Sequence, residues 1–300
     1  MIVVPLVVGL AVFVLVRLRD ARLAGLPDAV GVPVAFTPTR VTVSSSRARA
    51  VTALALAESR RLLTHPVLLV GGLLSVLVMG VSTPSDDPFA RYVELTGGGG
   101  TGLYVPLVVF VAAGLCASRS RRARAGEVLD ATAATPFDRT LAQCLAAAGP
   151  AVASFVLILA ALGRFVVTGA ELPATPPVWE LLTMPLAILG AGTLGVMVSR
   201  WLPFRGAPVL AVTALISVSI ALSGDFDMLI TYVEYAEWGD DDEYVGLASL
   251  PSAAHGLYII GLDVMAAIGA LLVHAGHRRL LLALGAVATA GTAVAALAAT

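Results

Sequence analysis

Eight apolar runs divide this chain, and most of them approach the ~20 residues that an α-helix needs to cross the hydrocarbon core of a bilayer. Of its 300 residues, 58% are hydrophobic and only 13% are charged, whereas soluble domains have roughly a quarter of their residues charged. The sequence therefore predicts an all-α fold, a polytopic bundle of about eight transmembrane helices. The predicted spans are Met1 to Val16, Pro66 to Ser82, Gly102 to Ala117, Leu141 to Val167, Trp179 to Ser199, Leu202 to Leu222, Ala253 to His274 and Leu280 to Ala299.

The arginines indicate how these spans are oriented. Segments rich in Arg or Lys near helix ends stay in the cytoplasm, and all arginines except Arg91 and Arg164 fall in alternate connections between the runs. The opposite connections carry acidic residues, for example Asp86, Asp87 and the run from Asp240 to Glu243. We therefore expect both termini to lie on the outer side of the membrane.

The segments that flank the central spans differ in character. Residues 1–17 have arginines after the apolar run and none before it, which predicts a transmembrane anchor, not a cleavable signal peptide. Residues 18–46 are expected to form an irregular cytoplasmic linker. In the outer segment 223–252, the stretch Phe226 to Trp238 has apolar side chains at helical spacing, which predicts an amphipathic helix at the outer interface or dipping into it. Residues 280–300 are predicted to add a C-terminal transmembrane helix.

The sequence contains no pattern that points to an enzyme. Every basic residue is Arg, and the phosphate-binding G-x-x-x-x-G-K-[ST] loop requires Lys. The four histidines lack the Cys or carboxylate neighbours of a metal site, and the glycine run Thr96 to Gly102 follows no strand. Cys116 and Cys144 lie near predicted cytoplasmic helix ends, where a disulfide is not expected. We expect no catalytic residue, cofactor, metal or nucleic-acid partner.

Asp263 is the one ionisable residue well inside a predicted span. An ionised side chain exposed to lipid costs ~2.5–3.5 kcal/mol on insertion scales, so it usually faces a cavity or a partner. Two roles are open for Asp263, a place in a substrate path or a structural hydrogen bond to a neighbouring helix, and the second is favoured. Arg164 lies nearer the outer end of its span, where it could pair with Asp263 or extend toward the interface.

The segment Ser118 to Thr140 is the longest strongly charged run of the chain. The arginines at its start need no explanation beyond the topology. The residues that follow resemble a short amphipathic helix on the cytoplasmic surface, and a proline then suits the first turn of a new helix. Such a surface could dock a partner. Its residues are Glu127, Val128, Leu129, Asp130 and Pro136.

A second cytoplasmic stretch, Arg47 to Pro66, is expected to form a helix that leads into the membrane. We call it the lead-in helix. Its apolar stripe is interrupted by Glu58, although a helix lying in the interface needs one clean apolar face. The stripe consists of Val51, Leu54, Ala55 and Leu62.

These stretches resemble, in this order, the membrane-spanning permease subunit of ABC transporters of the type-2 exporter family. "LAESRRLLTHPVLLVG" is similar to the family's helix before the first core span. "SRSRRARAGEVLDATAATPFDRTLAQCLA" is similar to the loop that joins core spans two and three and contacts the ATPase. "LPSAAHGLYIIGLDVMAAIGALLVHAGHRR" is similar to the last core span.

The resemblance covers residues 47–279 and treats the first and last spans as additions to a core of six. It assigns residues 47–65 to the lead-in helix, with Glu58, Arg60 and Arg61, and residues 118–140 to the ATPase-coupling loop.

The resemblance implies a transport subunit of the bacterial cytoplasmic membrane that is not itself an enzyme. It would pair with a second permease copy and move its substrate outward with energy from a separate cytoplasmic ATPase. The alternative is an ion-coupled secondary transporter. That class should show several intramembrane carboxylates or paired broken helices, and this sequence has one convincing buried acid.

Overall fold

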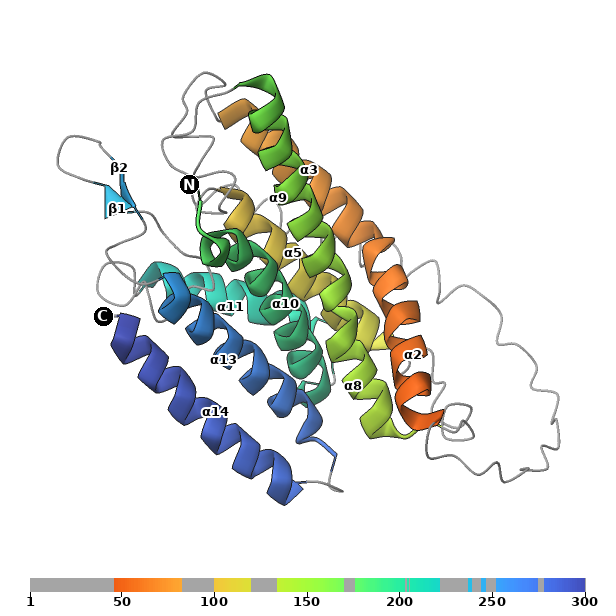
Figure 1. Ribbon diagram of the computed structural model, residues 1–300. Helices are drawn as coiled ribbons and strands as arrows, with labels where there is room; N and C mark the ends of the chain where they lie inside the picture. Colours follow the sequence, from red (N-terminus) through yellow and green to blue (C-terminus); the bar gives the residue numbers. More distant parts are fainter. Residues whose placement is uncertain are drawn as a thin grey trace, which may run out of the picture.

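The computed structural model of the chain describes residues 46–82, 100–119, 134–169, 176–202, 204, 206–221, 237–238, 244–246, 252–274 and 278–299. These residues form an all-α structure (Figure 1), which confirms the predicted class. The helices are α2 (Ser46–Leu63), α3 (Pro66–Ser82), α5 (Gly100–Ala117), α8 (Pro136–Ala146), α9 (Ala148–Thr168), α10 (Val178–Trp201), α11 (Ala207–Ala221), α13 (Ser252–Leu271) and α14 (Arg278–Ala299).

Each predicted run after the first corresponds to a helix among the described residues, although several bounds differ. The bounds of α3 are those predicted, whereas α11 begins at Ala207, later than the predicted run. The first run, Met1 to Val16, lies outside the described residues, as does the predicted linker 18–46 except for Ser46, which begins α2. Two helical segments, Pro136–Thr168 and Val178–Trp201, are long and apolar enough to cross a membrane. Four shorter apolar helical segments accompany them: Tyr104–Ala117, Ala207–Ser217, Gly256–Leu271 and Arg279–Ala295.

The outer segment contains the only β-structure in the described part of the chain, a hairpin of β1 (Glu237–Trp238) and β2 (Tyr244–Gly246). The predicted amphipathic helix Phe226 to Trp238 therefore does not reach its expected end, because its last two residues pair as a strand. The remainder of that prediction falls outside the described residues.

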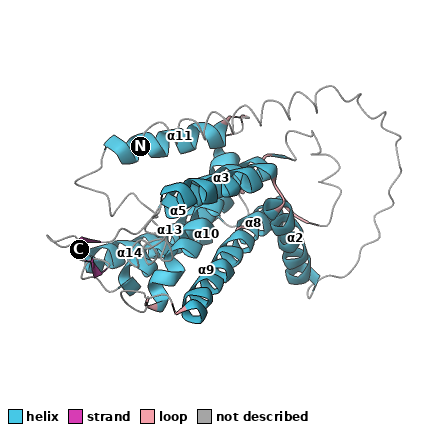
Figure 2. Ribbon diagram, turned by 90° about the horizontal axis from the view of Figure 1, so that it is seen from above, coloured by secondary structure: helices cyan, strands magenta, loops and turns pink. Residues whose placement is uncertain are grey.

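Helix α10 is the centre of the bundle. It packs against α5 on one side and α13 on another, α9 also contacts it, and α14 covers α13 (Figures 1 and 2). Small residues make the closest contacts. Gly195 lies against the backbone carbonyl of Phe110, and Gly114 lies against Ser199, whose hydroxyl donates to the Gly114 carbonyl at 2.8 Å. Small side chains let helix backbones approach closely, which is the usual packing of transmembrane helices.

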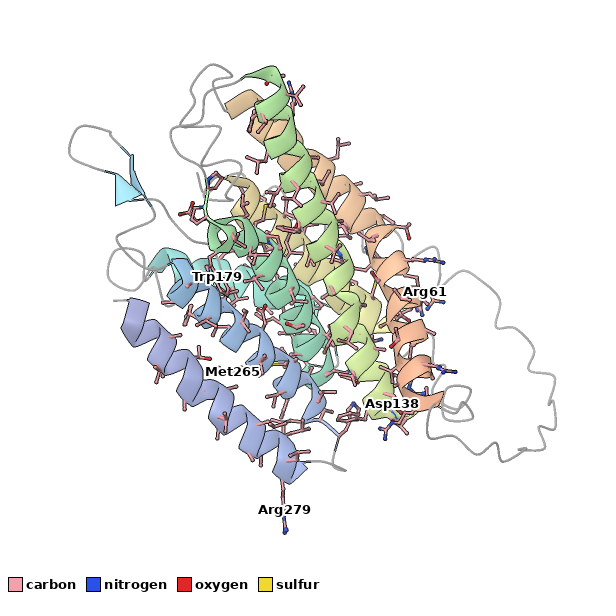
Figure 3. The ribbon with its side chains drawn as sticks, in the orientation of Figure 1. Arg61, Asp138, Trp179, Met265 and Arg279 are labelled. Carbon is pink, nitrogen blue, oxygen red and sulfur yellow. The ribbon has the colours of Figure 1, made fainter. Side chains whose placement is uncertain are left out.

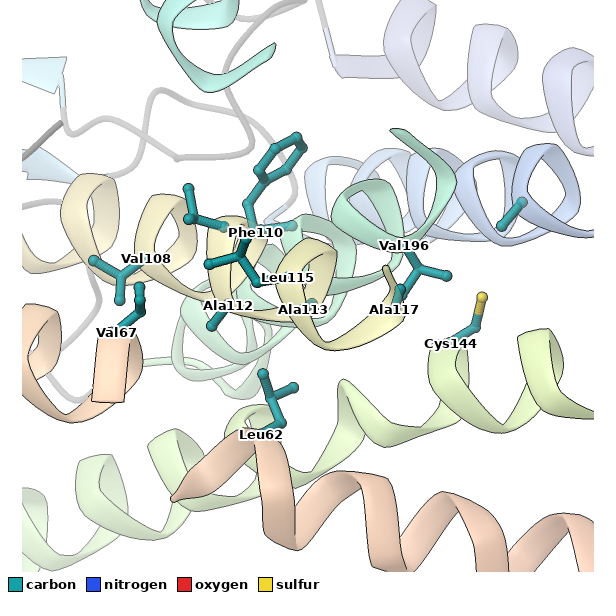
Figure 4. Close-up of a cluster of buried hydrophobic side chains, with 13 residues drawn as sticks. Leu62, Val67, Val108, Phe110, Ala112, Ala113, Leu115, Ala117, Cys144 and Val196 are labelled. Carbon is teal, nitrogen blue, oxygen red and sulfur yellow. The ribbon is translucent and has the colours of Figure 1, made fainter. Parts of the chain in front are cut away.

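The largest apolar cluster of the described residues lies where α2, α3, α5, α8, α10 and α13 meet (Figure 4). Helix α5 supplies most of it, including the fully buried Phe110 and Leu115. Leu62 of α2, Val67 of α3 and Cys144 of α8 reach the same cluster. The lead-in helix is thus joined to the core of the bundle through its last turn.

Candidate functional site

Charged side chains gather at one end of the bundle, which we call the charged end. There α2, α8 and α14 begin, and α5, α10 and α13 finish. Figure 3 shows Asp138 and Arg279 at this end, with Arg61 farther along α2, while Trp179 lies toward the opposite end. The charged end includes the lead-in helix and both flanks of the predicted coupling loop.

The predicted coupling loop leads into α8, whose first turn is capped by side chains. Thr135 is the N-cap of α8: its hydroxyl accepts from the Asp138 backbone N–H at 3.1 Å, and the Asp138 carboxylate accepts from the Thr135 backbone N–H at 3.3 Å. This reciprocal capping box satisfies two helix-end donors. Pro136 occupies the first turn, as predicted, and is exposed. The start of α8 is therefore defined locally by the sequence.

Asp138 also ties α8 to the lead-in helix. The Arg47 guanidinium donates to its Oδ1 from Nη2 at 2.8 Å and from Nε at 2.9 Å. Burial alone would raise the pKa of Asp138, but the hydrogen bonds from Thr135 and Arg47 outweigh it and hold that pKa below its ordinary value. Asp138 is thus held in its charged form, as both the cap and the ion pair require.

Helices α2 and α8 run side by side in the same direction. Arg47 meets Asp138 at their first turns, Val51 and Ala55 pack with Ala142, and farther along Ser59 lies against Gly149. Helix α2 thus contacts α8 at its first turns and the start of α9 farther along, so a displacement of α2 can be transmitted to both. The lead-in helix predicted from sequence is confirmed as a helix, and its buried face lies against protein.

Glu58 interrupts the apolar stripe of α2 but is buried, with 8% of its surface exposed. Its Oε1 accepts from Arg61 at 2.9 Å and from Arg119 at 3.4 Å. A buried carboxylate is tolerated when cations and hydrogen bonds offset its desolvation. The requirement for a clean apolar face therefore does not apply to this helix.

Both flanks of the predicted coupling loop are therefore ion-paired to α2. Arg119 lies at its start and binds Glu58; Asp138 lies near its finish and binds Arg47. The residues between them that were predicted to contact an ATPase, Glu127, Val128, Leu129 and Asp130, lie outside the described residues. Arg60 is exposed on α2, and its backbone carbonyl accepts from the Thr64 hydroxyl at 2.9 Å.

Helix α8 also contacts the last turns of α13, a connection that the sequence did not predict. Thr140 Oγ1 lies 2.9 Å from His274 Nε2 and donates its proton to the Pro136 carbonyl at 3.0 Å. The hydroxyl therefore accepts from an Nε2–H. The Phe137 ring meets the same imidazole edge-on, with centroids 6.4 Å apart.

The charge state of His274 follows from its surroundings. Burial lowers its pKa, and the positive charges of Arg200 and Arg139 lower it further. The neutral imidazole is thus favoured in the folded protein. Arg200, at the end of α10, also donates to Gln143 of α8 at 2.6 Å. Helix α8 is therefore in polar contact with α2, α10 and the turn after α13.

The two intramembrane candidates are not brought together. Asp263 lies in α13 with 6% of its surface exposed, and neither carboxylate oxygen has a hydrogen-bond partner among the described residues. Arg164 is exposed on α9, and the described part of the chain contains no ion pair between the two. The favoured prediction for Asp263 was a hydrogen bond to a neighbouring helix, and the described residues contain no such bond.

Within the described ranges, no three His, Cys, Asp or Glu side chains lie close enough together to bind a metal ion. Comparison of the chain with known protein families, characterised proteins and solved structures finds no match. The candidate site is therefore defined by its own geometry, the network that joins α2, α8 and α13 at the charged end.

Proposed function

We propose that this chain is the membrane-spanning permease subunit of an ATP-driven ABC transporter of the type-2 exporter kind. Its partners would be a separate cytoplasmic ATPase and a second permease copy. The observation that carries the proposal is that both flanks of the coupling loop are ion-paired to the lead-in helix. A force applied to that loop would act on α2 and α8 together.

The same network offers a route from the loop to the transmembrane helices. Helix α8 continues almost directly into α9, and α2 is separated from α3 only by Thr64 and His65. Helix α8 also contacts His274 after α13. A shift of the coupling loop would therefore reach three helices of the bundle at once. This arrangement suits a permease whose movement is driven by an ATPase on a separate chain.

Exposed apolar side chains support a place in a membrane. In the most apolar stretch of Pro136–Thr168, only 33% is buried. Val156, Leu157 and Val167 of α9 are 57%, 69% and 87% exposed. Contiguous apolar surface of this kind is unusual on a soluble monomer and costs about 25 cal/mol per Å² in water. Contact with lipid tails removes that cost, as expected for a polytopic protein of the cell membrane.

The length of the α8–α9 segment fits the same arrangement. Its 33 residues extend about 50 Å at 1.5 Å per residue, compared with a hydrocarbon core of about 30 Å. If α9 crosses the bilayer, α8 projects beyond it with α2 alongside. The charged end then lies in the cytoplasm, where an ATPase could reach it.

A secondary transporter driven by an ion gradient is the second candidate, and Asp263 is the observation that favours it. An intramembrane carboxylate without a partner is a common component of ion-coupled pathways. The two candidates differ in their energy source. An ABC permease loses transport when the ATPase of its partner is inactivated, whereas a secondary transporter loses it when an ionophore collapses the gradient.

The proposal can be tested with the ATPase encoded beside this chain, if one is present, co-expressed and purified with it. We expect Asp138→Arg and Arg47→Asp each to reduce permease-stimulated ATP hydrolysis several-fold, because like charges would separate α2 from α8. The double variant restores the ion pair in reverse but not the acceptor that Asp138 provides in the capping box, so it should recover part of the rate. Arg49→Asp, at an exposed site two residues farther along α2, is the matched control for changing the charge of that helix.

Charge reversal at Glu127 and Asp130 tests direct contact with the ATPase. We expect it to weaken co-purification while each variant still elutes as a single species. Stimulated hydrolysis that survives all these reversals would contradict the coupling role. Transport that continues without ATP but stops with an ionophore would identify the secondary transporter instead.

A further inference from the structure

Asp263 lies on the face of α13 that packs against α10. Ile259, Asp263, Ala266 and Ala270 recur at helical spacing and are all buried. Ala270 belongs to an apolar cluster with Val196 of α10, so this face is directed at that helix. The carboxyl is thus enclosed between two helices.

Helices α10 and α13 are in close contact on either side of the carboxyl. Toward one end, Gly256 lies against the Trp179 ring of α10; toward the other, Gly269 lies against the Met197 side chain. The Trp201 indole also donates to the Gly269 carbonyl at 2.9 Å. Asp263 lies between these contacts, about two turns from each. The Asp263 side chain therefore has little contact with solvent while α10 and α13 are packed, and 6% of its surface is exposed.

Neither neighbouring helix offers a counter-charge. From Leu181 to Ser199, α10 has no ionisable side chain, and α14 has none from Leu280 to Ala299. On α13 itself the other titratable residues are His255 and Tyr258, more than one turn away. No described ion pair includes Asp263.

The hydroxyls of the same helices are already used. On α10, Thr183, Thr193 and Ser199 donate to backbone carbonyls. On α14, Thr289 and Thr292 donate to carbonyls one turn back and lie near the sulfur of Met265. Neither oxygen of Asp263 receives a hydrogen bond from the described residues. An ionised carboxylate in this position would lose its hydration without compensation, which costs several kcal/mol.

We propose that Asp263 is a proton-binding site: it holds a proton while α13 packs on α10 and releases it when the two helices separate and water reaches the carboxyl. The site would make the packing of α13 sensitive to protons. This inference does not depend on the energy source of the protein, because it is argued from the packing of α13 on α10 alone.

A hydrophobic carbodiimide, dicyclohexylcarbodiimide, detects such an acid. The protonated carboxyl transfers its proton to one carbodiimide nitrogen, and its oxygen bonds to the central carbon. The resulting O-acylisourea rearranges to a stable N-acylurea, so the protein gains the mass of one reagent and loses nothing. A carboxylate without a proton does not take this route. Peptide mass spectrometry then locates the modification.

In membranes at neutral pH, we expect Asp263 to be labelled and the ion-paired Glu58 and Asp138 to remain unmodified. The latter two are controls because they are similarly buried but each has an arginine partner, and Asp138 is the stricter one, since Glu58 Oε2 has no hydrogen-bond partner among the described residues. Asp263→Asn should abolish the label, and Asp263→Glu, which keeps an acid there, should retain it. No label at Asp263, or equal labelling of Asp138, would overturn the proposal.

The release step is tested by locking the two helices. In a variant with Cys116→Ala and Cys144→Ala, the changes Met197→Cys and Gly269→Cys place a disulfide across the interface, where the Met197 Cγ lies 3.3 Å from the position of a Gly269 Cβ. We expect the oxidised form to keep its labelling at alkaline pH and the reduced form to lose it. Identical labelling of the two forms would contradict release by helix separation. None of these measurements involves an ATPase, so they can fail without affecting the proposed function.

Discussion

The charged end and the α5–α10–α13 core solve the same packing problem in different ways. At the charged end, helices are joined by ion pairs and caps, and the buried acids Glu58 and Asp138 each have arginine partners. In the core, helices are joined by glycine contacts, and the buried acid Asp263 has no described partner. Long charged side chains can reach one another only where the helices approach water. Deeper in the bundle, contact depends on the shape of the helix surfaces.

The largest effect of changing a close contact in the core is expected at Gly195, because this residue packs against the backbone of α5. A methyl group there would collide with the Phe110 carbonyl, which cannot move without displacing α5. We expect Gly195→Ala to destabilise the protein by about 2–3 kcal/mol, the upper range for overpacking. Thermal unfolding in detergent measures this loss.

The matched control is Gly163→Ala on the exposed face of α9, where no atom lies within 4 Å of the new methyl group. There the higher helix propensity of Ala should leave stability unchanged or raise it by about 0.5–1 kcal/mol. Equal changes in stability for Gly195→Ala and Gly163→Ala would show that close packing at Gly195 does not stabilise the core.

At the charged end, a comparable change should have a smaller effect. Thr135→Ala removes the N-cap of α8 and should cost about 1 kcal/mol. Amide hydrogen exchange in the first turn of α8 should accelerate while α9 stays protected. Thr52→Ala is the control, because the Thr52 hydroxyl donates only to the Ala48 carbonyl of its own helix. Unchanged exchange in α8 would mean that its start is fixed by tertiary contacts alone.

The smallest expected effect is a pH dependence of the contact between α8 and His274. The pKa of His274 is lower in the folded protein than in the unfolded chain. The contribution of His274 to the free energy of unfolding is therefore complete above the ordinary histidine pKa of about 6.5. This contribution is lost as the pH falls through the pKa of His274 in the folded protein, because the unfolded chain binds the proton more readily. Hydrogen exchange around Thr140 should increase over that range.

His274→Gln should remove this dependence and keep a side-chain donor. Asp138, whose pKa is also lowered, should respond only at lower pH, below the ordinary carboxyl value of about 4. A response of equal size in wild type and His274→Gln would assign the effect to another group.

The helices of the core could be predicted from sequence because their signals are local. Pro136 and the threonine before it mark the start of α8, and apolar runs mark α3, α10 and α13. The hairpin β1–β2 was missed because two short strands have no periodicity long enough to compete with the helical spacing before them.

The polar contacts could not be predicted. Arg47 and Asp138 are 91 residues apart, and Thr140 and His274 are 134 apart. Each is one of many charged or polar residues near a helix end. The sequence singled out Glu58 as an interruption in a stripe, but gave no sign that Arg119 would reach it.

The sequence by itself determined the helical class, the positions of the apolar helices and the isolation of a single acid within one of them. These depend on side-chain periodicity and composition, which act over a few turns. Only the tertiary structure decided that both flanks of the coupling loop are attached to the lead-in helix and that Asp263 is enclosed against α10 without a described partner. Those outcomes depend on which helices become neighbours, and that is set by packing of the whole bundle.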